Sequence, residues 1–466
     1  MSGKFKGFDA IVVGSGQGGN PLALALAKEG WQVALAEGKH VGGSCINTGC
    51  TPTKTMIASA RVAHLVGRAA DYGIDAAAGS VNFLKVRQRK DGVVESFRKG
   101  SRQRLLSTPG ITLLEGYARF VGEKQLEVEL ATGEKELITA EKVIIDTGAS
   151  PSMPSIPGLD GVNVLDSVSI LELDELPEHL LVIGGGYVGV EFGQMFRRFG
   201  SNVTIVQRNK QLLPQEDQDV ADEVAKILRE DGVEVLLGTD TLRVETRGGE
   251  QIALTVSKGG EERTLVGSHL LVAAGRVPNT SYLDPEATGI SLDKRGFVPV
   301  NEQLETAVPG IYAIGDVNGG PAFTHVSYDD HAILLKNFLQ GGEASTSDRL
   351  LPYVVFMDPQ LGRVGLTEKA AKERGMDYLV AKIPMSWVAR ALETDETRGL
   401  MKAIVDAQTD RILGAAILAV EGGELMSALQ IAMLGDVPYT ALRDGMFAHP
   451  TLSESFNTLF ASLERP

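Results

Sequence analysis

The stretch FDAIVVGSGQGGNPLALALAKEGWQVALAE, residues 8–37, decides the fold of this chain. Its pattern predicts a buried strand over residues 8–13, a helix over residues 21–29 and a second strand over residues 31–37. The turn between the first strand and the helix has the spacing GxGxxG, with Gly14, Gly16 and Gly19. The first glycine permits the tight turn, the second lets a diphosphate approach the backbone, and the third lets helix and strand pack closely.

Two further features complete a dinucleotide-binding unit. The N-terminus of the helix offers free N–H groups and a partial positive charge to phosphates. Glu37 closes the second strand, where a carboxylate can accept hydrogen bonds from a ribose diol. A lone GxGxxG is weak evidence, but here the strand, turn, helix and acid follow in the required order.

The same unit occurs a second time in HLLVIGGGYVGVEFGQMFRRFGSNVTIVQ, residues 179–207, with Gly184, Gly186 and Gly189. Glu37 follows Gly14 by 23 residues, and Gln207 follows Gly184 by the same 23 residues. Two chance turns would not be expected to share that spacing. The sequence therefore predicts two dinucleotide sites.

The two units differ in their last residue. Glu37 suits an unphosphorylated ribose, whereas Gln207 is neutral and is followed by Arg208 and Lys210. Loss of the acid and gain of cations suit a 2′-phosphate, so we expect NADPH at the second site, with NADH still possible. The alternative is that Arg208 only points to solvent.

A pair of cysteines follows the first unit, in GGSCINTGCTPTK, residues 42–54. Cys45 and Cys50 are five residues apart, about 7.5 Å of rise in a regular helix, too far for a disulfide. A bridge therefore requires a distorted backbone, which the neighbouring glycines permit. A helix that begins here, together with Lys54, would lower a thiol pKa. The alternative is two buried thiols that act as small apolar side chains.

Bulk composition excludes several classes of protein. The 466 residues predict two to four domains. The net charge of −15 argues against nucleic acid or an anionic membrane as partner. Two cysteines in all exclude a disulfide-stapled scaffold and cannot complete a four-ligand zinc site, so we expect no metal. The short stretch before the first strand and the lack of long apolar runs lead us to expect a cytoplasmic protein.

The segment GGSCINTGCTPTK resembles the motif GGxCxNxGCxPxK of the class I pyridine nucleotide–disulfide oxidoreductases. This family includes glutathione reductase, dihydrolipoamide dehydrogenase and mercuric reductase. The resemblance covers essentially the whole chain: the two glycine motifs, TGAS at 147–150, AAGRVPN at 273–279, GIYAIGDV at 310–317, LPYVVFMDPQLGRVGLTE at 351–368 and HPTLSE at 449–454.

The resemblance implies FAD at the first site and a role for each motif. Cys50 would be the thiolate beside the flavin, and Cys45 would be the interchange thiol that attacks the substrate. Lys54 would lie near the flavin N5 and pair with Glu191, while Tyr187 would cover the flavin until the nicotinamide displaces it. Further cofactor-binding positions fall in the matching segments: Gly43, Gly148, Gly275, Gly315 and Asp316.

His449 and Glu454 suggest how a leaving thiolate would be protonated. In the resembled family, a His and a Glu at this spacing reach across a homodimer interface to the partner's cysteines, so that the active site is shared. Local sequence alone also allows a capping box, in which Thr451 and Glu454 satisfy a helix start. We favour the acid–base role, with Glu454 orienting His449.

The resemblance predicts an α/β fold with two Rossmann-like domains and a C-terminal α/β dimerisation domain. The expected boundaries are 1–150 and 277–345 for the FAD domain, 151–276 for the nicotinamide domain and 346–466 for the interface domain. The expected reaction passes electrons from NAD(P)H through FAD and the cysteine pair to a small disulfide or thiol-reactive oxidant, such as hypothiocyanous acid.

Two related activities remain alternatives. The segment 387–398, WVARALETDETR, is similar to the mercuric-reductase branch, but no cysteine follows Cys50, whereas true mercuric reductases carry a C-terminal pair. Dihydrolipoamide dehydrogenase is a second alternative, although a Glu is expected there in place of Gln207. A docking subunit of a larger complex has no additional binding domain to support it.

Overall fold

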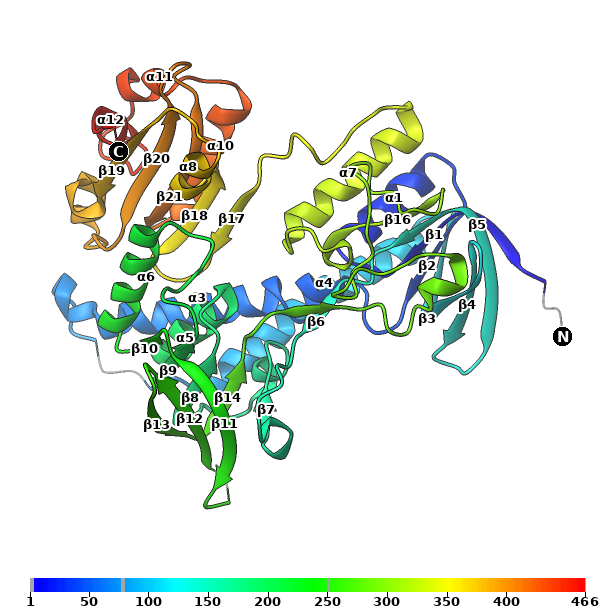
Figure 1. Cartoon of the computed structure of the whole chain (residues 1–466), viewed down its shortest axis with the longest axis horizontal. Coiled ribbons are helices and arrows are strands. Elements are labelled where there is room, and N and C mark those ends of the chain that lie inside the picture. Colours follow the sequence, from blue (N-terminus) through cyan, green and yellow to red (C-terminus); the bar gives the residue numbers. More distant parts are fainter. Residues whose placement is uncertain (1–3, 77–79, 250, 466) are drawn as a thin grey trace. The chain divides into compact units, whose positions relative to one another are not determined.

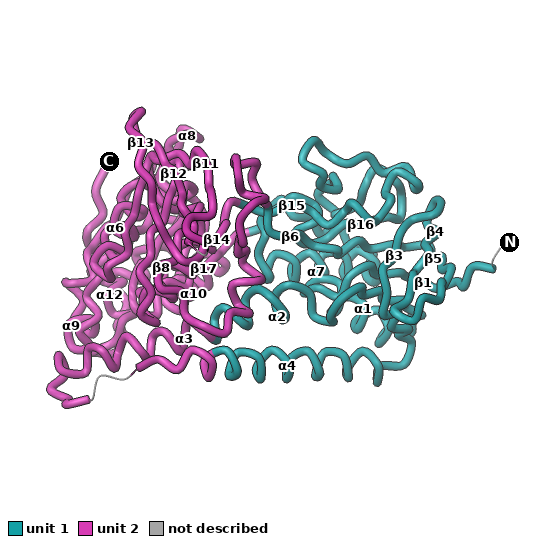
Figure 2. Tube along the Cα trace, turned by 90° about the horizontal axis from the view of Figure 1, so that it is seen from below, with its two compact units in different colours: residues 1–55, 87–152, 275–349 teal, residues 56–86, 153–274, 350–466 magenta. Residues whose placement is uncertain are grey.

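The computed structural model describes residues 4–76, 80–249 and 251–465, which form two compact units (Figure 2). Unit 1 comprises residues 1–55, 87–152 and 275–349, and unit 2 comprises residues 56–86, 153–274 and 350–466. Within the described ranges, no helix has the length and apolar character needed to cross a membrane. The boundaries between the four segments expected from the sequence stay predictions.

Unit 1 is built on a sheet whose central strands are parallel (Figure 1). Strand β1 lies between β2 and β5, and β16 extends the parallel part beyond β5. Strand β3 continues it beyond β2 and then turns back through the antiparallel strand β4 to β5. The strands are β1 (Lys6–Val13), β2 (Val33–Glu37), β3 (Ile111–Gly122), β4 (Gln125–Leu130), β5 (Lys135–Ile145) and β16 (Ile311–Ala313).

Alternate residues of β1 face two different cores of unit 1. Ala10 and Val12 pack with α1 (Gly19–Lys28) and α7 (Thr324–Gln340), which cover one face of the sheet (Figure 1). Ile11 and Val13 pack on the other face. The first glycine turn follows the carboxyl end of β1 and connects it to α1.

Unit 2 contains the second Rossmann-like sheet, with strands in the parallel order β10-β9-β8-β14-β7. Its helices α5 and α6 and an antiparallel sheet of β11, β12 and β13 belong to the same unit. The bounds are β7 (Val164–Leu165), β8 (His179–Ile183), α5 (Tyr187–Phe199), β9 (Asn202–Gln207), α6 (Gln218–Glu230), β10 (Glu234–Leu237), β11 (Asp240–Arg247), β12 (Gln251–Lys258), β13 (Glu261–Gly267) and β14 (His269–Val272).

The last part of unit 2 is an antiparallel sheet in the order β17-β18-β21-β20-β19. Its core joins the sheet to α10 and α12, for example through Met401, Ile417, Leu429 and Phe460. The bounds are β17 (Pro352–Val355), β18 (Gln360–Gly365), α8 (Glu368–Glu373), β19 (Tyr378–Pro384), α9 (Ala389–Glu393), β20 (Leu400–Asp406), β21 (Ile412–Ala419), α10 (Gly422–Leu434), α11 (Tyr439–Asp444) and α12 (Ser455–Ala461).

The remaining elements carry or adjoin the predicted site. Helices α2 (Gly43–Asn47) and α3 (Cys50–Gly67) hold the cysteine segment, and α4 (Phe83–Ser107) is a long helix that ends in unit 1. Strands β6 (Ala149–Pro151) and β15 (Arg276–Pro278) pair with each other. Two Rossmann-like sheets and a C-terminal α/β layer confirm the fold class predicted from the sequence.

Candidate active site: thiol pair and dinucleotide loops

The first glycine turn has no room for side chains. Gly14 has a φ of 104°, and a Cβ there would overlap the carbonyl oxygen of Asp146. A Cβ on Gly19 would lie 2.6 Å from the carbonyl oxygen of Gly14. Helix α1 begins at Gly19, two residues earlier than expected, so that the glycine turn leads directly into its N-terminus. This is the geometry that a diphosphate needs.

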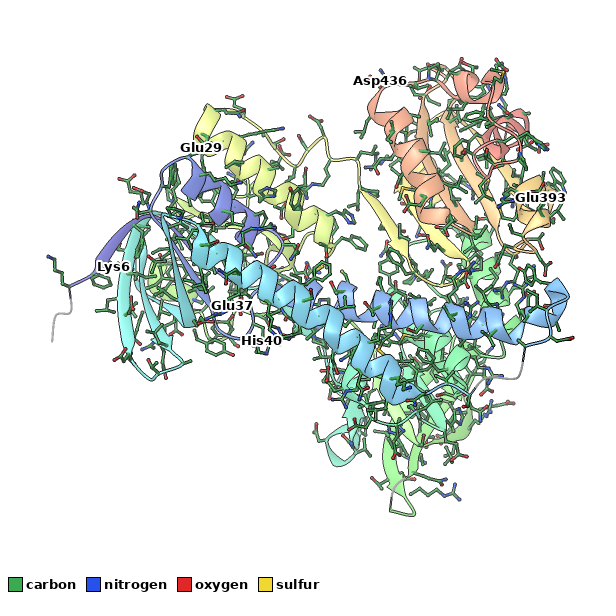
Figure 3. The ribbon with its side chains drawn as sticks, turned by 180° about the vertical axis from the view of Figure 1, so that it is seen from behind. Lys6, Glu29, Glu37, His40, Glu393 and Asp436 are labelled. Carbon is green, nitrogen blue, oxygen red and sulfur yellow. The ribbon has the colours of Figure 1, made fainter. Side chains whose placement is uncertain are left out.

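Glu37 and Ser15 link this turn to the cysteine segment. Glu37 ends β2 (Figure 3), and its carboxylate accepts hydrogen bonds from the Ser15 backbone N–H (3.1 Å), the Ser15 hydroxyl (2.6 Å) and the Lys39 N–H (2.8 Å). The N–H of Gly42 donates to the Ser15 hydroxyl oxygen at 3.0 Å. Gly43 has a φ of 60°, and a Cβ there would lie 2.7 Å from the Cα of Gly16. The cysteine segment is thus packed against the phosphate turn.

The cysteine segment is not one regular helix. Helix α2 ends at Asn47 and α3 begins at Cys50, and this break lets the two thiols form a hydrogen bond with each other. Cys45 is half-buried and Cys50 is exposed. The distorted backbone that the sequence required is therefore present.

The structure holds the two cysteines as thiols. The hydrogen bond with Cys50, burial and the charge on Cys50 all raise the pKa of Cys45, whereas Thr324 and Lys54 lower it. The ionisation of Cys45 therefore depends on that of Cys50.

Thr324 contributes a third group that the sequence did not reveal. Its hydroxyl oxygen lies 3.1 Å from the sulfur of Cys50. Thr324 is also the first residue of α7, a helix of 17 residues, and Cys50 is the first residue of α3. Two helix N-termini therefore meet at the thiols, and both favour a negative charge there. No local signal joins residues 274 positions apart, so pattern reading could not have found this contact.

Asn47 holds the cysteine segment in place. Its side-chain amide donates to the carbonyl oxygens of His40 (3.3 Å), Val41 (3.1 Å) and Gly43 (2.9 Å). Arg98 of α4 donates from Nε to the Asn47 side-chain oxygen at 2.7 Å. Another cation of α4, Arg102, pairs with Glu115.

Asn279 joins two of the segments that carried the family resemblance. Its side chain accepts from the Ser150 hydroxyl at 2.7 Å and donates to the Thr147 carbonyl oxygen at 2.8 Å. The segment also includes Gly148, with a φ of 67°, and Gly275, with a φ of 128°. Within unit 1, TGAS and residues 275–279 of AAGRVPN are therefore joined, and the pairing of β6 with β15 is part of this junction.

Asp316 lies in the turn after β16, preceded by Gly315 with a φ of 68°. Burial raises the pKa of Asp316, and Arg276 opposes this shift from 3.4 Å. The Gly315 N–H donates to the buried carboxylate of Asp330 at 2.8 Å. The turn that carries Asp316 is thus fixed by the buried acid Asp330 of α7.

Unit 1 fits a bound flavin dinucleotide on two independent observations. The first glycine turn leads directly into the N-terminus of α1, and Glu37 ends β2 at the expected ribose position. Among the residues that the structure describes, the buried side-chain oxygens of Asn20 and Thr147 have no hydrogen-bond partner. Asn20 follows Gly19 in the sequence, and Thr147 follows Asp146, whose carbonyl packs against Gly14. Buried polar atoms without partners point to a polar ligand.

The second glycine turn repeats the geometry of the first within unit 2. A Cβ on Gly184 would overlap the carbonyl oxygen of Ala273, and one on Gly189 would overlap that of Gly184, whereas Gly186 faces open space. Gln207 is buried and accepts from the Gly185 N–H at 3.2 Å. The side chain therefore braces its own turn, a role that the sequence did not indicate. Arg208 and Lys210 are exposed.

Tyr187 begins α5 and ends a chain of buried groups in unit 2. Its ring lies 5.4 Å from that of Tyr353, whose hydroxyl donates to Glu216. Arg363 donates from Nε to the same carboxylate at 3.0 Å. Glu191, on the same helix, accepts from the Phe356 N–H at 2.8 Å. The predicted partnership of Glu191 with Lys54 joins residues of different units and stays a prediction.

His449 and Glu454, the residues predicted to act as an acid–base pair, are in contact, and their role stays a prediction. Nδ1 of His449 lies 3.0 and 2.9 Å from the two carboxylate oxygens of Glu454, while 66% of the His449 side chain is exposed. The capping box forms only in half, because Thr451 accepts from the Glu454 N–H but the Glu454 carboxylate faces His449. The carboxylate thus fixes one ring nitrogen, and the exposed ring can exchange a proton.

Comparison with known proteins assigns the family. Residues 8–330 match the model for pyridine nucleotide-disulphide oxidoreductases, and residues 351–460 match the dimerisation domain of the same family. The chain therefore belongs to the class I pyridine nucleotide–disulphide oxidoreductases. It is an enzyme, a flavoprotein that acts on sulfur groups with a pyridine nucleotide as electron partner.

Individual relatives cover nearly the whole chain. RclA of Escherichia coli K12, named a probable pyridine nucleotide-disulfide oxidoreductase, is 41% identical, with 97% of this chain and 99% of RclA aligned. A dihydrolipoyl dehydrogenase of Thermus scotoductus is 36% identical, with 96% of each chain covered. A solved structure of RclA, described as an HOCl-induced flavoprotein disulfide reductase, superposes with a TM-score of 0.88 at 40% identity, over 97% of this chain and 99% of RclA.

Proposed function

We propose that this enzyme uses NADPH to reduce a small disulfide or a thiol-reactive oxidant through Cys45 and Cys50. The observation that carries this proposal is the thiol pair placed at the N-termini of α3 and α7. When bound, FAD supplies the step between the two-electron donor and the thiol pair. The protein residues do the rest: they hold the cofactor, keep the thiols together and manage protons.

The reduced thiols of Cys45 and Cys50 supply both electrons that reduce the disulfide. Cys45 gives up its proton and attacks one sulfur of a disulfide, which forms a mixed disulfide and releases the first thiolate. Cys50 then attacks the Cys45 sulfur, which releases the second thiolate and leaves the Cys45–Cys50 disulfide. His449, oriented by Glu454, protonates a leaving thiolate. We propose that His449 acts on the partner's cysteines in a homodimer, because the chain carries the dimerisation domain of the family.

NADPH is preferred in this proposal because two exposed cations, Arg208 and Lys210, follow Gln207. A 2′-phosphate is recognised by Arg and Lys side chains at this position of the fold. Replacing both cations by Ala should raise the KM for NADPH and leave the KM for NADH unchanged. Equal effects on both nucleotides would contradict the assignment. The cytoplasmic location expected from the sequence remains a prediction.

Turnover assays with cysteine variants test the proposal. Cys45→Ser should abolish reduction of disulfides and of hypothiocyanous acid, because the attacking thiolate is gone. His449→Gln should slow turnover most where the leaving thiolate is basic. Lys372→Gln, a substitution on α8 in the dimerisation domain, is a control that should retain activity. Full disulfide reductase activity in Cys45→Ser would refute the role of the pair.

A thiophilic metal ion is a second candidate substrate. A mercuric reductase of Staphylococcus aureus is 34% identical over 96% of this chain, and one solved structure of RclA is a Cu(II) complex. Against Hg(II) stands the absence of any cysteine after Cys50. NADPH oxidation that depends on Hg(II) or Cu(II), and that is lost in Cys50→Ser, would favour this candidate over the disulfide.

A further inference from the structure

Asp146 places a buried carboxyl group in the middle of the first glycine turn. It follows directly after β5, and its Oδ2 accepts the backbone N–H of Gly19 at 2.8 Å. A Cβ on Gly16 or on Gly19 would each lie 2.7 Å from this same oxygen. Asp146 therefore occupies part of the helix N-terminus that a dinucleotide diphosphate also uses.

The second glycine turn shows what the same architecture looks like without this acid. Gly14 packs against the Asp146 carbonyl, and Gly184 packs in the same way against the carbonyl of Ala273. Ala273 has only a methyl group where Asp146 has a carboxyl, and Gly186 faces open space where Gly16 faces the carboxyl. The fold thus does not require an acid at this position, and Asp146 is specific to the flavin side.

The surroundings of Asp146 disfavour a negative charge. Burial raises the pKa of Asp146 well above its ordinary value; the hydrogen bond from Gly19 opposes this shift, and the charges of Asp316, Asp330 and Glu37 add to it.

Each neighbouring acid has its own partner. Asp316 faces Arg276 at 3.4 Å, Asp330 faces Arg349 at 2.6 Å, and Glu37 accepts from Ser15 and Lys39. In the part of the chain that the structure describes, no Lys or Arg side chain forms a hydrogen bond with the Asp146 carboxyl group. A diphosphate at the same helix end would add further negative charge.

We propose that Asp146 is a positioning residue that stays a neutral carboxylic acid while FAD is bound. It holds the N-terminus of α1 through Gly19 without placing a charge beside the diphosphate, and its ionisation is coupled to release of FAD. The proposal rests on flavin binding at the first glycine turn. Because FAD carries negative phosphates, binding raises the proton affinity of Asp146 further. FAD therefore binds best when Asp146 carries its proton, so the affinity of the protein for FAD falls as pH rises.

The test is the dissociation constant of FAD for the apoprotein, followed by flavin fluorescence as a function of pH. In the window between the pKa of Asp146 without and with FAD, the affinity of the wild type should fall about tenfold per pH unit. Asp146→Asn keeps an acceptor for Gly19 but cannot ionise, so its affinity should lack this slope. Asp146→Ala, which copies the second turn, should also lack the slope and bind more weakly.

Asp9→Asn is the matched control. Asp9 lies in the same unit and accepts a backbone N–H from Gln32 at 2.7 Å, but it is exposed and lies outside the turn. This variant should keep the pH profile of the wild type. The infrared C=O stretch of a protonated carboxylic acid in the wild-type holoprotein should disappear in Asp146→Asn, which reports protonation without any use of activity.

The outcomes separate this inference from the proposed function. If wild type and Asp146→Asn have the same pH profile, Asp146 is not coupled to FAD and the inference is wrong, while the thiol chemistry stands. If both lose FAD affinity with the same slope and the infrared bands are identical, another group carries the proton. If the wild-type apoprotein does not bind FAD at all, the flavin assignment itself fails.

Discussion

Replacement of Thr324 by Val probes the electrostatics of the thiol pair most directly. The hydroxyl oxygen lies 3.1 Å from the Cys50 sulfur, and its hydrogen bond also lowers the pKa of Cys45. Val has nearly the same shape and lacks the hydroxyl, while α7 still begins at position 324. Thr324→Val therefore removes one hydrogen bond from the Cys50 sulfur and leaves the N-termini of α3 and α7 in place.

The expected magnitude follows from that single bond. A hydrogen bond contributes about 0.5–1.5 kcal/mol net, so the anion should become less populated by about twofold to tenfold at a given pH. The pKa of Cys45 should rise further. Alkylation by iodoacetamide requires the thiolate, and the reduced variant should therefore react more slowly by the same factor below the thiol pKa.

The assay is the alkylation rate of the reduced protein as a function of pH, with the modified cysteine identified by mass spectrometry. Thr108→Val is the matched control, because the Thr108 hydroxyl donates to the Arg104 carbonyl at the end of α4, away from the sulfurs. It should react like the wild type. If Thr324→Val alkylates as fast as Thr108→Val throughout the pH range, the hydroxyl does not stabilise the thiolate and the reasoning is refuted.

Three further substitutions have defined outcomes. Glu216→Gln removes the nearest counter-charge of the buried Arg363 guanidinium and leaves only the carboxylate of Asp217 at 3.7 Å. It should lower the free energy of unfolding by about 3–5 kcal/mol, measured by thermal unfolding against the exposed control Glu373→Gln; equal melting temperatures would contradict it. The pKa of His64 is lowered to about 4, mainly by burial, so the unfolded chain takes up the proton first as pH falls. The free energy of unfolding should therefore drop between about pH 6.5 and 4 in the wild type but not in His64→Asn. Parallel curves of stability against pH for the two proteins would contradict this. Gly43→Ala should destabilise the protein by about 2–4 kcal/mol and reduce its flavin content, because Gly43 has a positive φ and a Cβ there would clash with Gly16. Gly73 has a similar φ but lies in open space, so Gly73→Ala should lose less stability. An equal loss of stability in the two variants would exclude the clash.

The fold followed from local sequence because each dinucleotide unit is continuous in the chain. The strand, glycine turn, helix and second strand of residues 8–37 are neighbours in sequence, and periodicity identifies each of them. The ends of the elements were less accurate, since the helix begins at Gly19 and includes Pro21 in its first turn, where proline is tolerated.

The site was predicted where its residues share one segment and missed where they do not. Cys45, Cys50 and the break between them lie within a few residues, so spacing alone required the distortion that the structure has. Thr324 reaches the thiols only through tertiary packing, and no spacing announces it. The sequence could have indicated Asp146, because an acid directly after the apolar residues 143–145 (Val-Ile-Ile) is unusual at the end of a buried strand.

Anaerobic titration of the purified holoprotein with NADPH and with NADH, with a parallel count of accessible thiols, tests whether electrons pass through Cys45 and Cys50. Reduction should produce two new thiols per chain together with a long-wavelength absorbance band from a thiolate beside oxidised flavin, both appearing faster with NADPH. The band and the new thiols should be absent in Cys50→Ser. Flavin bleaching without the band and without new thiols would mean that Cys45 and Cys50 lie outside the electron path.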